Sequence, residues 1–216
     1  LIQASNGKLY GMTYYGGANY MGVLFEYDPT TSIYTKKMDF AGVTTGSYPL
    51  GSLMQASNGI LYGMTYYGGT NGLGVLFQYN ISTSTYTKRL DFAGTTNGSY
   101  PYGSLIQASN GKLYGMTYYG GANNQGVLFE YDTATKSYTK KLDFAGATSG
   151  SNPFGSLLKA SSGKLYGMTN GGGASGQGVL FEYNLSTSTY TKRVDFAGTT
   201  NGSNPRGSFI EASNGE

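Results

Sequence analysis

The chain has 216 residues, of which 36 are Gly and 22 are Tyr, and it contains no Cys, His or Trp. A net charge of +3 is too small to indicate a nucleic-acid partner, and the absence of Cys excludes disulfides and thiolate chemistry. No apolar run approaches the ~20 residues of a membrane span, so we expect no membrane insertion.

A strict period of 52 residues organises the sequence. "LIQAS" at residue 1 returns as "LMQAS" at 53, "LIQAS" at 105, "LLKAS" at 157 and "FIEAS" at 209. We therefore predict a single repeat domain over 1–216, with repeats at 1–52, 53–104, 105–156 and 157–208 and a partial repeat at 209–216. Both ends fall inside a repeat, and we expect a segment of a longer array that continues into a larger ring or a head-to-tail filament.

Each repeat is predicted to form four short strands. In the second repeat, taken in chain order, these are "GSLMQAS" (51–57), "ILYGMTYY" (60–67), "VLFQYN" (75–80) and "YTKRLDF" (86–92). Asn58-Gly59 supplies the positive φ of a hairpin turn between the first two strands. Because strand residues alternate between faces, one face of the fourth strand is expected to carry Tyr86, Lys88, Leu90 and Phe92.

Four strands in about 50 residues, repeated without insertion, are typical of a propeller blade. A lone sheet of this kind has two apolar faces, and it buries both only when similar sheets stack against it. The sequence therefore predicts an all-β protein, a β-propeller of four-stranded antiparallel blades. A β-solenoid is the alternative, although solenoid coils are shorter and contain fewer two-residue hairpin turns.

An Asp-Phe pair ends the predicted fourth strand of every repeat, at Asp39-Phe40, Asp91-Phe92, Asp143-Phe144 and Asp195-Phe196. Four such carboxylates could form a ring of ligands or acids. A residue present in every blade more often builds the blade, so we expect each Asp to accept backbone N–H bonds from a turn and each Phe to pack between blades. The basic pairs that begin at residues 36, 88, 140 and 192 are expected to split between opposite strand faces.

The sequence offers little for catalysis. With no His and no Cys, the commonest general base and the strongest nucleophile are missing. One slot of the third strand holds Glu26, Gln78, Glu130 and Glu182, so it does not require a charge in every repeat. No spacing typical of a calcium or zinc site is present. We therefore predict a protein without enzymatic activity, metal or cofactor; a propeller hydrolase or lyase is the weaker alternative.

The stretch "GSYPLGSLMQASNGILYGMTYYGGTNGLGVLFQY" (46–79) resembles the GloVer (Gloeo/Verruco) tandem repeat. The matching positions are Gly46, Pro49 and Leu53, the turn Ser57-Asn58-Gly59, Leu61-Tyr62-Gly63 with Thr65, Gly68-Gly69, and Gly74 with Phe77 and Tyr79. The resemblance recurs in every repeat. It implies a propeller-like fold and an extracellular or cell-surface location, and it implies no particular activity.

Two function hypotheses follow. The first is a non-enzymatic structural or adhesive surface module. The second is a carbohydrate-binding, lectin-like propeller with one shallow site per blade, in which amphipathic aromatic rings and nearby amides meet the sugar. The candidate ligand-binding residues are Tyr14, Tyr15, Asn19, Tyr66, Tyr67, Asn71, Tyr118, Tyr119 and Asn123. The expected partners are glycans or other copies of the chain, and no nucleic acid.

The tyrosine pairs are the variable part of the repeat. "MTYYGG" occurs at 12–17, 64–69 and 116–121, whereas 168–173 reads "MTNGGG". If the fourth repeat folds like the others, the tyrosines are surface residues available to a partner. Strand alternation, however, predicts that at least one ring of each pair packs inside the blade. Four N-glycosylation sequons, placed in predicted turns, begin at Asn80, Asn97, Asn184 and Asn201.

Overall fold

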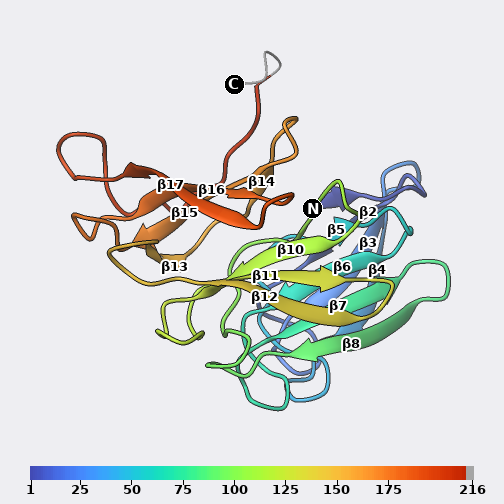
Figure 1. The fold of residues 1–216 in the computed structure, drawn as a ribbon. Coiled ribbons are helices and arrows are strands. Elements are labelled where there is room, and N and C mark those ends of the chain that lie inside the picture. The colour runs from blue at the N-terminus through green and yellow to red at the C-terminus, as the bar shows by residue number, and fades with distance from the viewer. Residues whose placement is uncertain (213–216) are drawn as a thin grey trace. The chain divides into compact units, whose positions relative to one another are not determined.

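The computed structural model describes residues 1–212, and in that range the chain forms β-strands and loops with no helix (Figure 1). The all-β prediction is therefore confirmed. Among these residues no helix of the length and hydropathy needed to cross a membrane is present. The chain divides into two compact halves, Leu1–Phe92 and Ala93–Glu216, and each is described by itself below. The last four residues of the predicted partial repeat, 213–216, lie outside the described residues.

The N-terminal half consists of two antiparallel four-stranded blades, each with its strands in sequence order. The first blade contains β1 (Ile2–Gln3), β2 (Leu9–Met12), β3 (Val23–Asp28) and β4 (Ile33–Asp39). The second blade contains β5 (Met54–Gln55), β6 (Leu61–Thr65), β7 (Val75–Asn80) and β8 (Thr85–Asp91). These are the four strands per repeat that the sequence predicts, with the first strand shorter than expected.

The C-terminal half contains one four-stranded and one five-stranded blade. The third blade contains β9 (Ile106–Gln107), β10 (Leu113–Thr117), β11 (Val127–Asp132) and β12 (Ser137–Asp143). The fourth blade contains β13 (Ser151–Pro153), β14 (Leu158–Lys159), β15 (Leu165–Gly171), β16 (Val179–Asn184) and β17 (Thr189–Asp195). β13 lies in the third repeat of the sequence but pairs with β15, so the chain crosses between blades before the repeat ends.

A β-bulge in the fourth strand of each blade, the outer strand, changes which of its residues share a face. In the second blade, Leu76 pairs with Leu90 but Phe77 pairs with Lys88, so that Arg89 is the extra residue. The expectation that Leu90 shares the face of Lys88 is therefore wrong, because the bulge shifts the alternation by one residue. The same shift occurs in the other three blades.

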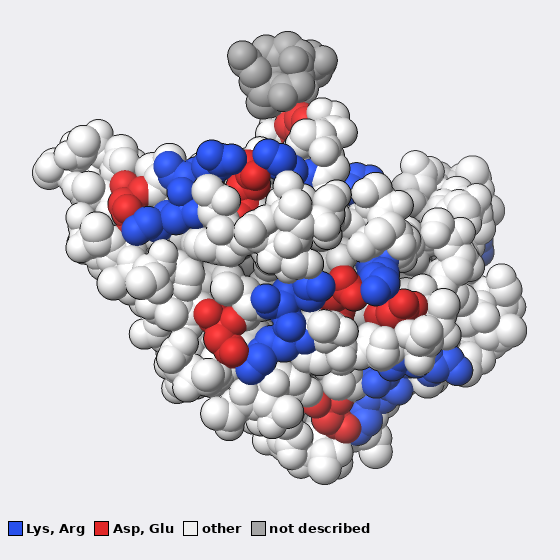
Figure 2. Space-filling model, viewed as in Figure 1, with Lys and Arg blue, Asp and Glu red and all other residues white. Residues whose placement is uncertain are grey.

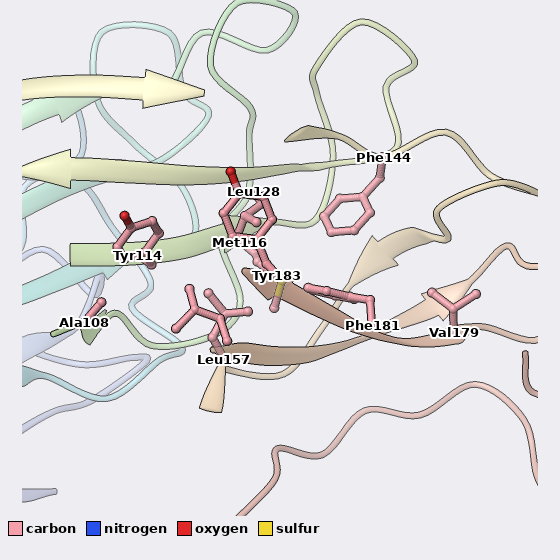
Figure 3. Packing of buried hydrophobic residues seen from close by; sticks show 10 residues of the cluster. Ala108, Tyr114, Met116, Leu128, Phe144, Leu157, Val179, Phe181 and Tyr183 are labelled. Carbon is pink, nitrogen blue, oxygen red and sulfur yellow. The ribbon is translucent and has the colours of Figure 1, made fainter. Parts of the chain in front are cut away.

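Stacking of one blade on the next buries the apolar core within each half. In the N-terminal half the ring of Phe40, which is fully buried, meets the ring of Phe77 in the following blade at a centroid distance of 5.7 Å. In the C-terminal half Phe144 meets Phe181 at 5.5 Å, and Figure 3 shows the two rings with Leu157 and Met116 in the same cluster. The prediction that the Phe of the Asp-Phe pair packs between blades is confirmed for these two residues.

The innermost edge of a blade is completed by a segment that comes from the preceding repeat. Ser47 exchanges two backbone hydrogen bonds with Tyr67, at 2.8 and 3.0 Å, and the amide of Tyr48 donates to the carbonyl of Met21 in the first blade. In the C-terminal half Ser151 pairs with Gly171 in the same way, within β13 and β15. This segment therefore joins two successive blades at their seam, and it carries the residues discussed below.

Candidate functional site

The recurrent aspartates lock the glycine-rich loop of their own blade. One carboxylate oxygen of each accepts the N–H of the residue that follows the glycine doublet, at 2.8–2.9 Å; the pairs are Asp39 with Ala18, Asp91 with Thr70, Asp143 with Ala122 and Asp195 with Ala174. The glycines of that loop adopt positive φ, for example 83° at Gly68 and 77° at Gly69. The prediction that these carboxylates bind a turn of their own blade is confirmed.

The basic pair of the first blade divides between two acidic partners. Lys36 binds Asp39 at 2.8 Å, whereas the ammonium of Lys37 lies 3.6 Å from Glu26 on the other face of the sheet. The bulge brings the first lysine and the aspartate, three residues apart, onto one face. On the face shown in Figure 2, basic and acidic side chains accordingly lie next to one another in mixed groups. The prediction that each basic pair splits is therefore confirmed in this blade.

The third-strand carboxylate belongs to a buried network that the sequence did not reveal. Glu26 is 8% exposed; it accepts the Tyr10 hydroxyl at 2.5 Å and the Lys8 ammonium at 2.8 Å. Glu130 binds Tyr114 and Lys112 in the same way. Each carboxylate thus has hydrogen bonds from both sides, as a buried charge requires.

The second repeat replaces this network as a unit. Gln78 stands where the other repeats have Glu, and it accepts the Arg89 guanidinium N–H at 2.9 Å. At the position of Lys8 the second repeat has Ile60, which carries no charge. The second repeat therefore has neither the lysine nor the carboxylate of this network, and Arg89 is hydrogen-bonded to the neutral Gln78 instead. The slot is structural in all four repeats.

The ionisation of these groups follows from their contacts. Burial alone would raise the pKa of Glu26, but the hydrogen bonds from Lys8 and Tyr10 outweigh it and hold the pKa below its ordinary value. Burial and the bond to Glu26 raise the pKa of Tyr10 to about 12. In the fourth blade the Lys164 bond is the largest influence, and it lowers the pKa of Glu182 to about 2. The carboxylates are thus ionised at neutral pH, and their oxygens are hydrogen-bonded to lysine and tyrosine side chains.

The predicted tyrosine pairs lie just beyond the ends of the second strands. β2 ends at Met12 and β6 at Thr65, although Tyr67 still forms a β-bridge with Ser47; the interpretation that at least one ring of each pair packs inside the blade stays a prediction. The rings of Tyr14 and Tyr15 contact each other edge to face, with centroids 4.5 Å apart. The inner ring of the pair is half-buried and the outer ring is 67% exposed.

The backbone at this point does not depend on the tyrosines. The Thr13 hydroxyl donates to the Tyr15 carbonyl at 2.8 Å, and in the fourth blade the Thr169 hydroxyl donates to the Gly171 carbonyl at the same distance. Asn170-Gly171 therefore fold like the tyrosine pairs. The hypothesis that the rings are dispensable for the blade is supported by this equivalence.

Five tyrosines of the N-terminal half form one surface cluster, which we call the N-terminal tyrosine cluster: Tyr14, Tyr15, Tyr48, Tyr66 and Tyr67. Tyr48 is its centre, with ring centroids 5.2 Å from Tyr14, 5.7 Å from Tyr15 and 6.0 Å from Tyr67. The cluster therefore joins tyrosines of two successive repeats at the blade seam. It contains four of the predicted ligand-binding residues and one, Tyr48, that sequence reasoning missed.

A related aromatic cluster lies in the C-terminal half, where Tyr118 and Tyr119 contact each other edge to face at 4.6 Å. Tyr100 approaches Tyr119 at 6.1 Å. Tyr102 stacks on Phe154 at 4.4 Å, and the Arg206 guanidinium lies 5.4 Å from the centre of the Phe154 ring. Tyr102, Phe154 and Arg206 occupy one position in successive repeats, so this ladder also follows from the 52-residue period.

Backbone strain marks the tyrosine at the centre of the N-terminal cluster. Tyr48 has a φ of 54°, and Tyr100 at the same place in the next repeat has 55°. The third and fourth repeats use Asn152 and Asn204 there, with φ of 57° and 50°. Asn accepts this left-handed conformation far more readily than a bulky residue does. The difference between "GSYP" and "GSNP" in the sequence was the available signal for this site.

The predicted amide partners have structural bonds instead. The side-chain amides donate to the carbonyl of the Phe that follows the outer strand, at 2.9–3.0 Å; the pairs are Asn19 with Phe40, Asn71 with Phe92 and Asn123 with Phe144. Their N–H groups hold the loop against the blade, and the structure does not bring them into the ring contacts of the tyrosine clusters.

The four sequon asparagines differ in environment. Asn97 is 8% exposed and its side-chain oxygen accepts the Ala93 N–H at 2.6 Å. The exposed Asn201 accepts from Ala197 and donates to the Asp195 carbonyl. Asn80 and Asn184 end β7 and β16, where each accepts the N–H of the serine two residues later. Glycosylation at these positions stays a prediction. Among residues 1–212 no group of three or more acidic side chains is placed to hold a metal ion.

A family model described as the Gloeobacter/Verrucomicrobia repeat matches residues 1–158. The chain belongs to this repeat family. The resemblance read from the motif at 46–79 is thereby confirmed, and the blade contacts described above show which family positions build the repeat. No protein of curated function matches the chain.

Solved structures share the fold of this repeat protein. An extracellular domain assigned to a one-component system of B. thetaiotaomicron is 15% identical, with a TM-score of 0.66 over 99% of this chain and 24% of its own. TolB from Acinetobacter baumannii is 13% identical, with a TM-score of 0.56 over 86% of this chain and 40% of TolB. A Bacteroides uniformis protein assigned as a 6-phosphogluconolactonase is 13% identical, with a TM-score of 0.59 over 92% of this chain and 57% of its own.

At these identities the shared feature is the fold alone. The propeller-like architecture predicted from the four-strand repeat is confirmed by the antiparallel blades and by these similarities. The chain spans between 24% and 57% of the three solved chains, so their activities are not carried over to it.

Proposed function

We propose that this chain is a non-enzymatic, extracellular adhesive module built from tandem blades. The observation that carries the proposal is that two sets of recurrent side chains in the repeat have different roles. The recurrent Asp and Glu side chains are committed to bonds inside their own blade, whereas the tyrosines that the fourth blade omits stand at the surface. A catalytic carboxylate needs room for a substrate, and a Glu such as Glu130, 6% exposed beneath Tyr114 and Lys112, has none.

The extracellular location rests on two lines of support. The motif resemblance implies export, and one structure of similar fold is named as an extracellular domain. A larger ring or filament that includes other copies of this chain stays a prediction.

A lectin-like role is the second candidate, favoured by the exposed rings. Tyr15 is 67% exposed, and Tyr67 and Tyr119 are each 39% exposed. The amides of Asn19, Asn71 and Asn123 donate to the blade itself, so the tyrosines would supply most of such a site.

Adhesion can be measured with beads coated with the purified chain and placed on bacterial cells, cellulose, chitin and glass. We expect the coated beads to resist washing on at least one biological surface, more than albumin-coated beads do. Soluble reducing sugar released from the same surfaces should not increase, because no catalysis is expected. Beads that attach nowhere, or sugar release that scales with protein concentration, would contradict the proposal.

A further inference from the structure

We propose that the N-terminal tyrosine cluster is a binding site for a neutral polysaccharide, built at the blade seam around the strained residue Tyr48. This inference rests on the adhesive function proposed above and gives it a ligand class. It also changes the location of the site: instead of one site within each blade, the rings of two successive repeats form one surface.

The first argument is that the fold does not need these rings. The fourth repeat keeps the same backbone with Asn170-Gly171 in place of a tyrosine pair, and Asn152 adopts the φ of Tyr48 without an aromatic ring. Asn152 uses its amide to hold the Tyr118 carbonyl at 3.1 Å, a bond that tyrosine has no amide to make. With a tyrosine at residue 48, the first repeat lacks this hydrogen bond from a side-chain amide to the backbone.

The second argument is strain. A bulky residue with a φ of 54° is a conformational outlier, and such residues concentrate at functional sites because the surroundings must hold them there. The φ at this position is held by backbone hydrogen bonds, from the Tyr48 N–H to the Met21 carbonyl and from the Tyr66 N–H to the Tyr48 carbonyl. The fold therefore imposes an unfavourable conformation on Tyr48, whose ring lies in contact with Tyr14, Tyr15 and Tyr67.

The third argument concerns the chemistry of the ligand. A pyranose ring has C–H groups on its faces and hydroxyls around its rim, which match the apolar face and the hydroxyl of tyrosine. Phenol hydroxyls both donate and accept hydrogen bonds without a charge, so they suit a neutral polyol. Ring centroids of Tyr14, Tyr48 and Tyr67 follow one another at 5.2 and 6.0 Å, with ring planes inclined by 37° and 87°, so faces and edges of several rings follow one another along the seam. A surface that extends over rings of two successive repeats favours a polymer over a monosaccharide.

The test uses a substitution that the protein itself supplies. Tyr48→Asn introduces the residue of the third repeat, and the matched control Tyr20→Asn does the same at an exposed tyrosine with φ 56°, where the third repeat has Asn124. The probes are cello-, laminari-, manno- and xylo-oligosaccharides of increasing length on an array, followed by calorimetry with the best binder.

We expect the wild-type chain to bind at least one series more tightly as the oligosaccharide lengthens. Tyr48→Asn should weaken that binding by about tenfold or more, whereas Tyr20→Asn should leave it unchanged. The melting temperature of Tyr48→Asn should equal or exceed that of the wild type, because the strained tyrosine is gone. A stable variant that no longer binds separates recognition from folding.

Three outcomes would overturn the inference: no binding of the wild type to any series, equal binding by Tyr48→Asn, or tyrosine-dependent binding of a proline-rich peptide in place of the sugars. Bead adhesion measured on the same variants separates the two proposals. Adhesion that survives Tyr48→Asn contradicts only the sugar site, whereas a wild type that adheres to nothing contradicts the adhesive function as well.

Discussion

At the residue scale, a buried carboxylate in this repeat depends on the cations around it. Glu182 is 4% exposed and binds Lys164 at 2.9 Å and Arg193 at 2.6 Å. Removing one member of such a set leaves a buried charge unpaired, which costs more than the pair contributes. The second repeat has no buried carboxylate to pair, because it combines Ile60 with Gln78, and its Arg89 binds that neutral amide.

Recreating that combination in the fourth blade tests this explanation. Glu182→Gln alone should lower the free energy of unfolding by about 1–3 kcal/mol at pH 7, because the cations lose their carboxylate. Adding Lys164→Ile should restore most of the loss. Urea denaturation of the full chain measures both. If the double variant is no more stable than the single one, the two positions are not coupled.

The same carboxylate predicts a pH dependence. Its folded pKa, about 2, lies below the ordinary value of 4.5, so its stabilisation is complete above about pH 4.5 and is lost as the pH falls through the folded pKa. The difference in unfolding free energy between wild type and Glu182→Gln should therefore narrow as the pH is lowered from 4.5 towards 2. A difference that stays constant over this range would contradict the assignment.

At the element scale, the glycines of the seam segment allow backbone to approach a neighbouring strand. Gly98 and Gly94 exchange two backbone hydrogen bonds, at 2.8 and 2.9 Å, and a Cβ on Gly98 would overlap the Thr117 hydroxyl at the end of β10. That hydroxyl donates to the Tyr119 carbonyl and accepts the Val127 N–H. The loop, the strand end and the third strand are thus held together at one point.

Two glycine variants can separate the cost of a steric overlap from the cost of a left-handed backbone conformation. Gly98 has a φ of 91° and Gly111, in the first hairpin turn of the third blade, has 79°, but only Gly111 faces open space. We expect Gly111→Ala to cost about 1 kcal/mol for the left-handed backbone and Gly98→Ala a further 1–3 kcal/mol, roughly, for the overlap. Thermal or urea unfolding gives both values; equal costs would show that the Thr117 contact does not matter.

At the scale of the whole molecule, stability comes from the stacking of blades. Phe77 and Tyr79 are at most 1% exposed, whereas their counterparts in the first repeat, Phe25 and Tyr27, are half-buried. The hydroxyl of Tyr86 donates to the Thr45 carbonyl of the preceding repeat, while its counterpart Tyr34 is 55% exposed. A face of the blade becomes a core only when the preceding repeat covers it.

A single blade should therefore not fold alone. We expect residues 53–92 to show no cooperative urea transition, because Phe77 loses the ring of Phe40. Residues 1–92, which form the compact N-terminal half, should unfold cooperatively. Circular dichroism with analytical ultracentrifugation compares the two fragments. A monomeric 53–92 with a sigmoidal transition would show that stacking is not required.

The sequence by itself determined the period, the four strands of each repeat, the family and the structural role of the Asp-Phe pair. These features depend on local chemistry: alternation within a strand, glycine at positive φ, and a carboxylate that meets the turn of its own blade. They recur every 52 residues, and this recurrence made them recognisable in the sequence. The sequence did not determine which residues share a strand face, because a single bulge residue such as Arg89 reverses the alternation.

Only the tertiary structure decided which side chains meet. Tyr14 and Tyr48 are far apart in the chain and come together because the seam segment reaches back to the Met21 carbonyl. The partners of Glu26 likewise come from two other strands of its blade and from the turn before β2. A contact between elements depends on how they pack, and no local pattern records that. The repeated tyrosines were visible in the sequence, but the surface they form was not.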